Sequence, residues 1–176
     1  MALDFKHPVD RVENISREEF QEKYMKPQKP VVLRGFLGDS ACYKKWSFDY
    51  FKKVAGEVEI QCFRNLEEDL DKTLKKSDIK MKFGDYLDII KKGPTDLRLH
   101  LFNVFKHHPE LYDDFSFPII ADNFLKKFCY MFFGGHGSVA RMHQDIDLSN
   151  VFLTQFEGQR RVVLFAPEYS ELLYRY

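Results

Sequence analysis

The sequence predicts a mainly β protein with flanking helices, and three observations support that prediction. Short runs in which apolar and polar residues alternate recur along the chain, as is typical of strands buried on one face. Eighteen Phe and nine Tyr favour a sheet core or an apolar pocket. Gly and Pro residues separate these runs from segments with helical periodicity. The length of 176 residues suits one domain over residues 1–176.

Composition restricts the classes of partner. Lys plus Arg and Asp plus Glu number 27 each, so the net charge is zero, which argues against a general binder of nucleic acid or anionic membrane. The three cysteines contain no Cys-x-x-Cys pair, and so indicate neither a disulfide framework nor a zinc knuckle. No run approaches 18 apolar residues and no secretory signal is readable, so we expect a cytoplasmic protein without a membrane span.

The N-terminal third predicts two capped helices and two strands. Ser16 followed by Glu19 forms a capping-box pattern, and the helix that it begins ends before Pro27. A second helix is expected from the cap Ser47 to Gly56. The expected strands cover residues 31–33 and 58–62.

The middle of the chain mixes both kinds of element. Residues 66–81 are charged with little periodicity, which indicates a surface loop or an irregular helix. Helical spacing predicts a helix over 83–92 that ends at Gly93, and alternation predicts a strand over 97–102. A short helix is expected over 109–115.

Four strands are expected around a glycine-rich segment near the C-terminal end of the sequence. They cover residues 128–133, 138–145, 151–157 and 161–165. The last two, joined through residues 157–160, are expected to form a hairpin.

His143 and Asp145 are the leading candidates for metal ligands. Side chains alternate along a strand, so two residues two positions apart point the same way and can bind one ion. One imidazole and one carboxylate, with a second His, leave positions open on a non-haem Fe(II). The alternative is a polar pair on the exposed face of a strand.

A series of features in fixed order resembles one known family. The glycine-rich segment 133–137, the His143-x-Asp145 motif, the apolar run 151–156 and the Gly158 turn before Arg160 resemble the JmjC/cupin-like Fe(II)- and 2-oxoglutarate-dependent oxygenases. Two segments of the N-terminal half, residues 29–37 and 45–51, are similar to the opening of the same group. The likeness covers most of the chain and is weakest between residues 65 and 128.

The resemblance implies a double-stranded β-helix, the jelly-roll of cupins and JmjC domains. In that fold residues 1–127 form an N-terminal region of helices and strands, and residues 128–176 form the first barrel strands. The resemblance also implies Fe(II), with 2-oxoglutarate and O2 as co-substrates. His143 and Asp145 take the place of metal ligands with a catalytic role.

The resemblance further implies a set of residues that bind 2-oxoglutarate. Arg160 stands where relatives place a basic residue for the distal carboxylate, whereas Arg161 lies on the opposite strand face; the alternative is that both are exposed hairpin charges. Asn150 corresponds to an asparagine that helps to bind the co-substrate, although it lies about one residue further out, and a turn-forming role is the alternative. These assignments depend on the register of the hairpin.

One family contact is missing. Many relatives place a Thr three residues before the ligand His, where this sequence has Ala140. Ser138 or Thr154 could supply the substitute hydroxyl, and a plain core position is the alternative for Thr154. His136 is interpreted as a loop residue near the mouth of the site.

The family metal site also needs a second His on a later strand, and no His follows His143. The expected strands are fewer than the eight that close a double-stranded β-helix. We therefore expect either a fragment of a longer protein or a partner, a homodimer among the options, that completes the barrel. The 176-residue chain alone is expected to be inactive.

The function implied is Fe(II)- and 2-oxoglutarate-dependent oxygenation, with hydroxylation of a protein side chain. Two alternatives stay open: a non-catalytic cupin-like binding module, and an RNA-modifying hydroxylase, which the neutral charge makes the weaker of the two. No membrane partner is expected.

Overall fold

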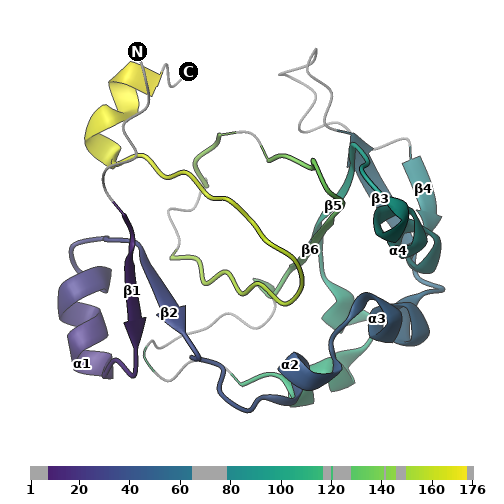
Figure 1. Cartoon of the computed structure of the whole chain (residues 1–176), viewed down its shortest axis with the longest axis horizontal. Coiled ribbons are helices and arrows are strands. Elements are labelled where there is room, and N and C mark those ends of the chain that lie inside the picture. The colour runs from purple at the N-terminus through teal and green to yellow at the C-terminus, as the bar shows by residue number, and fades with distance from the viewer. Residues whose placement is uncertain are drawn as a thin grey trace. The chain divides into compact units, whose positions relative to one another are not determined.

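A computed structural model of the chain describes residues 8–64, 79–116, 120, 128–140, 142–145 and 150–173 (Figure 1). The chain separates into two compact units, Met1–Met142 and His143–Tyr176. Regular strands are found, among the described residues, in the first unit only.

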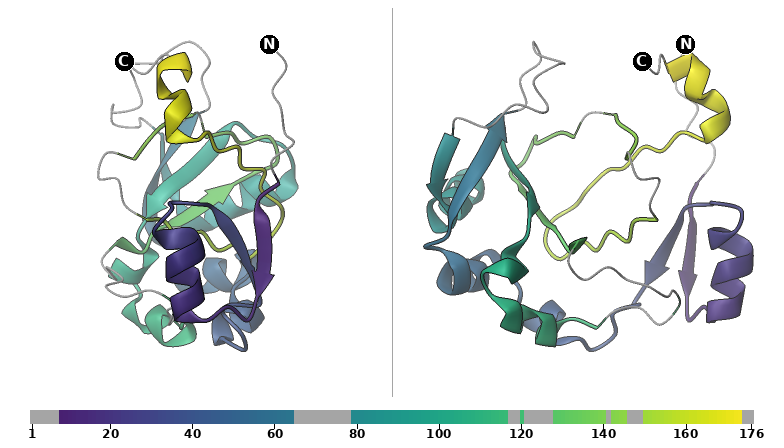
Figure 2. Two further views of the ribbon diagram at one scale, coloured as in Figure 1. Left: turned by 90° about the vertical axis from the view of Figure 1, so that its left-hand side faces the viewer. Right: turned by 180° about the vertical axis from the view of Figure 1, so that it is seen from behind.

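The first unit begins with a small parallel sheet. Strand β1 (Asp10–Glu13) pairs with β2 (Val31–Arg34), with Asp10 opposite Val31 and Glu13 opposite Arg34. Helix α1 (Arg17–Phe20) continues into the π-helical turn η1 (Gln21–Met25) and lies beside the two strands (Figures 1 and 2). A cluster packs this helix against the strands, and its buried members are Ile15, Phe20, Tyr24 and Ile120.

The predicted caps of both N-terminal helices are confirmed. Ser16 Oγ accepts a hydrogen bond from the Glu19 backbone N–H at 3.1 Å. Ser47 Oγ accepts one from the Tyr50 backbone N–H at 3.2 Å, and α3 (Phe48–Ala55) ends at Gly56 as expected. Helix α2 (Ala41–Lys45), which precedes α3, was not predicted.

The main sheet has four antiparallel strands in the order β4–β3–β5–β6. Their bounds are Glu59–Arg64 for β3, Ile79–Lys82 for β4, Leu97–Phe102 for β5 and Met131–Gly134 for β6. Arg98 lies opposite Phe63 on one side and opposite Gly134 on the other. Leu101, at φ 54°, lies where the β5–β6 register shifts between Leu99 and Phe102.

Helices α3 and α4 (Phe83–Lys92) cover one face of this sheet, which we call the near face (Figure 1). Phe133 of β6 contacts Phe51 of α3 and Phe83 of α4, with ring centroids 5.6 Å and 4.9 Å apart. Tyr86 of α4 donates a hydrogen bond to the Phe133 carbonyl at 2.7 Å. The near face also buries four strand residues: Ile60, Cys62, Leu97 and Leu99.

The opposite face, which we call the far face, carries the alternate residues of the same strands. Strand alternation places Phe63, Arg98, His100, Phe132 and Gly134 there. Arg98 and His100 are half-buried and Phe132 is exposed. The far face is therefore more polar than the near face.

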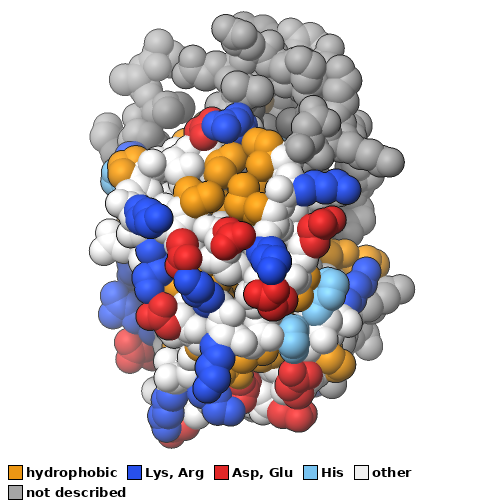
Figure 3. Space-filling model, turned by 90° about the vertical axis from the view of Figure 1, so that its right-hand side faces the viewer, with side chains coloured by type: hydrophobic (Ala, Val, Ile, Leu, Met, Phe, Trp, Pro, Cys, Tyr) orange, Lys and Arg blue, Asp and Glu red, His pale blue; other side chains and the backbone are white. Residues whose placement is uncertain are grey.

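Basic and acidic side chains are interspersed on the surface shown in Figure 3. Lys52 of α3 forms an ion pair with Asp88 of α4 at 2.6 Å, and Lys91 of α4 forms one with Asp49 at 2.6 Å. All four side chains are exposed, so each pair contributes little to stability. This surface has the mixed charge expected of a protein with zero net charge.

Short 3₁₀ helices follow β5 in the sequence. Asn103 caps η3 (Val104–Lys106), its side chain accepting from the Lys106 backbone N–H at 3.2 Å. The helix expected over residues 109–115 is η4 (Pro109–Asp114), and the second unit contains η6 (Pro167–Leu173). Among the described residues, no helix is long and apolar enough to cross a membrane.

Several predicted elements were wrong. Residues 138–140, 142–145, 151–157 and 161–165 form no strand, so neither the expected strands nor their hairpin is present in the described residues. A strand needs a neighbour to pair its backbone N–H and C=O groups, and no described strand pairs with these segments. Their apolar side chains are exposed as a result: Val151, Phe152, Leu153, Val162, Val163, Leu164 and Phe165.

Two further boundaries differ from expectation. Residues 79–81, expected as loop or irregular helix, belong to strand β4 because they pair with β3, for example Lys80 with Gln61. Residues 65–78 lie outside the described residues. Strand β6 begins at Met131 rather than at Phe128, which is exposed.

Candidate functional site

The two predicted metal ligands lie close together in the second unit. His143 Nε2 is 3.7 Å from Asp145 Oδ1, and their side chains are 68% and 53% exposed. Two donor atoms that each lie about 2.1 Å from one ion, at right angles, are about 3.0 Å apart. Small side-chain rotations would therefore let this pair bind one ion.

The donor set fits Fe(II) in kind but supplies two positions. Imidazole and carboxylate are the ligand types of non-haem Fe(II) sites, which use two His and one carboxylate. Within the described part of the chain, no three His, Cys, Asp or Glu side chains are grouped closely enough to hold a metal ion. His136, the nearest other histidine in the sequence, is exposed in the turn before Gly137.

The predicted co-substrate residues of the second unit lie on extended chain. Asn150 and Arg160 are exposed and Thr154 is half-buried. Gly158, at φ 75°, adopts the left-handed conformation that favours glycine, so the turn predicted before Arg160 is present. The roles of these three side chains in binding 2-oxoglutarate stay predictions.

Ser138, the remaining predicted co-substrate residue, lies against β6 in the first unit. A Cβ added to Gly134 would lie 2.2 Å from Ser138 Oγ, so the hydroxyl occupies the place of the missing side chain. Ser138 also closes a turn, its backbone N–H donating to the Gly135 carbonyl at 3.1 Å. Ala140, where relatives have a Thr, is exposed.

Two residues of the far face were not singled out by sequence. Arg98 Nη1 donates to the Val139 carbonyl at 3.0 Å, while its Nε is buried without a hydrogen-bond partner. His100 packs against Phe63, with ring centroids 4.4 Å apart, and its Nδ1 is likewise buried and unpaired. The alternation of residues over 97–102 could have pointed to them, since it places Arg98 and His100 on the face of the strand that Leu97 and Leu99 do not occupy.

Burial and the neighbouring Arg98 determine the charge of His100. Burial, and after it the positive charge of Arg98, lower the pKa of the His100 imidazole. His100 is therefore neutral at pH 7 and can donate one hydrogen bond and accept another.

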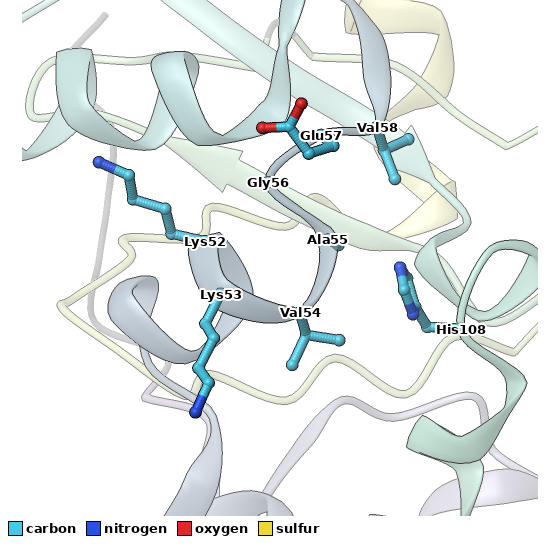
Figure 4. A pocket seen from close by; sticks show the side chains of 8 residues that line it. All are labelled: Lys52, Lys53, Val54, Ala55, Gly56, Glu57, Val58 and His108. Atoms are coloured by element: carbon cyan, nitrogen blue, oxygen red, sulfur yellow. The ribbon is translucent and has the colours of Figure 1, made fainter.

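A separate hollow of about 300 Å³ lies at the C-terminal end of α3, beside His108 (Figure 4). The amino groups of Lys52 and Lys53 point away from His108 in this view. His108 Nδ1 lies 3.0 Å from Glu110 Oε1, so its polar contact is made outside the hollow. Two of its charged lining residues form ion pairs with residues outside the lining, Lys52 with Asp88 and Glu57 with Lys82, each at 2.6 Å.

Comparison with known proteins gives the family. A profile described as the cupin-like domain matches residues 17–176. Lysine-specific demethylase 8 of Xenopus tropicalis is 27% identical over 190 residues, covering 98% of this chain and 39% of the relative. The mouse tRNA wybutosine-synthesizing protein 5 is 26% identical, with 95% of this chain and 58% of the relative covered. Arginine-specific demethylase JMJ22 of Arabidopsis thaliana is 26% identical, over 91% of this chain and 31% of the relative.

The chain therefore belongs to the JmjC/cupin-like domain family. This confirms the family inferred from the motifs and, with it, the fold class of a mainly β, jelly-roll domain with helices. The chain spans between about a third and three fifths of the length of these relatives.

Proposed function

We propose that this chain is part of an Fe(II)- and 2-oxoglutarate-dependent oxygenase that hydroxylates a protein side chain. Membership of the JmjC/cupin-like family supports the class of enzyme. The single observation that carries the proposal is the approach of His143 Nε2 to within 3.7 Å of Asp145 Oδ1, at the motif where the family binds its metal.

His143 and Asp145 would hold the metal, each through one donor atom. Bound Fe(II) supplies the redox chemistry by which O2 and 2-oxoglutarate together oxidise a substrate C–H bond. The guanidinium of Arg160 would bind the distal carboxylate of 2-oxoglutarate with two parallel hydrogen bonds. Asn150, Thr154 and Ser138 would add an amide and two hydroxyls.

The substrate class follows from charge and from the relatives' names. Two of the relatives are named as lysine- and arginine-specific demethylases, and the third for synthesis of a tRNA base. A neutral chain favours a protein substrate, because RNA binding generally requires a basic surface. A tRNA-directed enzyme is the alternative, and Ala140 is the observation that favours a non-catalytic module.

Metal binding by single variants tests the proposal. We expect the 176-residue chain to bind Mn(II) weakly, because a site with two protein ligands fills its other positions with water. Electron paramagnetic resonance of Mn(II) measures this binding. His143→Ala or Asp145→Ala should weaken binding by about tenfold or more. His136→Ala is the matched control and should leave the affinity unchanged.

Two outcomes would contradict the assignment. Unchanged Mn(II) affinity in both His143→Ala and Asp145→Ala would show that the ion binds elsewhere. Robust conversion of 2-oxoglutarate to succinate by the 176-residue chain under air would show that it does not need a third ligand from outside its own sequence.

A further inference from the structure

Strand β4 lies at an edge of the main sheet. The strand order β4–β3–β5–β6 gives it one neighbour, β3, among the described strands (Figure 1). An edge strand offers backbone N–H and C=O groups with which another extended chain can pair. In recognition of this kind, backbone hydrogen bonds give affinity and alternate side chains give specificity. The side chains of β4 therefore indicate which chain would fit.

One set of alternate side chains on β4 is apolar and only half-buried. Met81 lies directly opposite Ile60, and Ile79 lies directly opposite Cys62. Ile60 and Cys62 are buried, whereas Ile79 and Met81 keep part of their surface in solvent. Figure 3, which views the molecule from the side of β4 and α4, shows apolar side chains gathered among charged ones. The apolar surface of the near face thus reaches the edge of the sheet.

The other set of alternate side chains on β4 is basic. Lys80 and Lys82 alternate with the apolar residues, and each side chain is 58% exposed. Lys82 Nζ donates to Glu57 Oε2 at 2.6 Å, whereas Lys80 Nζ lies 3.9 Å from Glu59 Oε1, too far for a hydrogen bond. Exposed ion pairs of this kind contribute little to stability. Both ammonium groups can therefore bind a partner's carboxylate without the loss of a strong contact within the chain.

A second copy of the chain is a poor partner for this edge. Two copies of β4 related by a two-fold axis would pair antiparallel with matching faces, because an axis that reverses the strand direction in the sheet preserves the face. The lysines of one copy would then lie opposite the lysines of the other. Directly opposed like charges are destabilising. The same alternation favours a strand that carries acidic side chains at these positions.

We propose that β4 is a docking edge for an extended acidic segment of a partner protein, which adds to the main sheet as a further strand. Acidic residues at alternate positions of that segment contact Lys80 and Lys82. Apolar residues between them extend the row formed by Ile79 and Met81. This edge is independent of the metal assignment, because none of the predicted metal or co-substrate residues belongs to β4.

A synthetic peptide tests the edge. The probe is acetyl-Glu-Val-Glu-Val-Glu-amide, added to the isotope-labelled 176-residue chain. We expect saturable NMR shifts of the Lys80 and Lys82 backbone amides and slower hydrogen exchange in β4. A peptide with the order Glu-Glu-Glu-Val-Val has the same charge but no alternation. It should bind about fivefold more weakly, because its acidic and apolar side chains no longer lie on separate faces.

Methylated peptides distinguish strand pairing from simple charge attraction. Every second residue of an added strand directs its backbone N–H toward β4. One peptide carries N-methyl groups on both valines, and another carries them on the glutamates. We expect one of the two to lose saturable binding and the other to bind within about threefold of the unmethylated probe. Because the change is in the peptide, folding of the chain is not affected.

Substitution of exposed lysines locates the contact. Lys80→Glu should weaken binding of the probe by about fivefold or more, because a repulsion replaces an attraction. Lys44→Glu is the matched control, since Lys44 of α2 is also exposed, also lies 3.9 Å from one carboxylate, that of Asp39, and lies outside the sheet. We expect Lys44→Glu to bind the probe within about twofold of the wild type.

Several results would overturn the proposal. They are the absence of a saturable shift in the wild type, equal losses in Lys80→Glu and Lys44→Glu, and equal binding of the two methylated peptides. If the resonances of Lys80 and Lys82 moved with the concentration of the chain itself and not with the peptide, the edge would pair with a second copy, and the acidic partner would be wrong.

Discussion

Asp114 is a buried carboxylate that joins three parts of the first unit. It accepts hydrogen bonds from Lys45 Nζ at 2.5 Å, Trp46 Nε1 at 3.2 Å and the Tyr50 hydroxyl at 3.3 Å. Burial opposes ionisation, but the hydrogen bonds from Lys45 and Trp46, the charge of Lys45 and the Tyr50 hydroxyl outweigh it and lower the pKa of Asp114. Through these hydrogen bonds Asp114, the last residue of η4, links η4 to α2 and α3.

We expect Asp114→Asn to lower the free energy of unfolding by about 2 kcal/mol at pH 7, because it removes hydrogen bonds to an ionised group. Since the folded-state pKa lies below the ordinary value of 3.8, the stabilisation is present above about pH 4. It is lost as the pH falls through the folded-state pKa. Urea unfolding measured between pH 3 and pH 7 checks both statements.

The neighbouring exposed Asp113 gives the control. Asp113→Asn should change the stability by less than about 0.5 kcal/mol at any pH in this range. The difference in the free energy of unfolding between the wild type and Asp114→Asn should become smaller as the pH falls. If it did not, the carboxylate would not be the source of the stabilisation.

Arg160 and Arg161 are adjacent residues for which different roles are proposed. In the complete protein, Arg160→Ala should weaken 2-oxoglutarate binding by about tenfold or more, because a bidentate contact to a carboxylate is lost. Arg161→Ala should leave the affinity within about twofold. Isothermal titration with the metal-loaded protein measures both, and a larger effect of Arg161→Ala would reverse the assumed register of the turn.

At the scale of elements, helices α3 and α4 approach closely at two glycines. The Gly84 backbone N–H donates to the Gly56 carbonyl at 2.9 Å. A Cβ on Gly84 would lie 3.3 Å from both the Cα and the carbonyl oxygen of Gly56. Both positions are backbone, which limits how far the neighbour can move.

We therefore expect Gly84→Val to lower the free energy of unfolding by about 2 kcal/mol, since the added methyl groups would force the two helices apart. Thermal unfolding followed by circular dichroism measures the change. Asp85→Val places the same side chain at the next position of α4, which is exposed, and should cost about 1 kcal/mol or less. Equal costs for the two variants would show that helix propensity, not the contact, determines the effect.

Elements were predictable from the sequence where local chemistry determines them. Each of the caps Ser16 and Ser47 bonds the backbone N–H three residues later, so the local sequence was sufficient to predict both helix starts. Strand β1 was not predicted because its residues Asp10–Glu13 include one aliphatic residue, and its stability comes from pairing with β2 some twenty positions away. Strand β4 was missed although Ile79 and Met81 alternate with Lys80 and Lys82, because an alternation of four residues is short and the strand is stabilised by its pairing with β3.

The same distinction between local patterns and tertiary contacts applies to the candidate site. The spacing of His143 and Asp145 is local, and the sequence led directly to a pair whose donor atoms lie 3.7 Å apart. Strand parity could place Arg98 on one face of the sheet, but not its contact there, because the hydrogen bond from Arg98 Nη1 to the Val139 carbonyl joins residues 41 positions apart.

At the scale of the whole molecule, residues 150–165 combine strong β propensity with exposed apolar side chains. Leu164 is 62% exposed, and its neighbours Val162 and Val163 are also exposed. Exposed apolar side chains gathered in a segment of high β propensity favour association with other chains. This chain also has zero net charge, so long-range repulsion does not oppose contact between molecules.

We expect the 176-residue chain to associate increasingly as its concentration rises, measured by size-exclusion chromatography with light scattering. Leu164→Lys should shift this association to concentrations several-fold higher, because it places a charge within the apolar segment. Val32→Lys adds the same charge at an exposed valine of β2, 39% exposed and outside the segment, and should have little effect. If both variants weakened association equally, net charge rather than the exposed segment would control it; if neither did, residues 150–165 would not be the surface through which the chains meet.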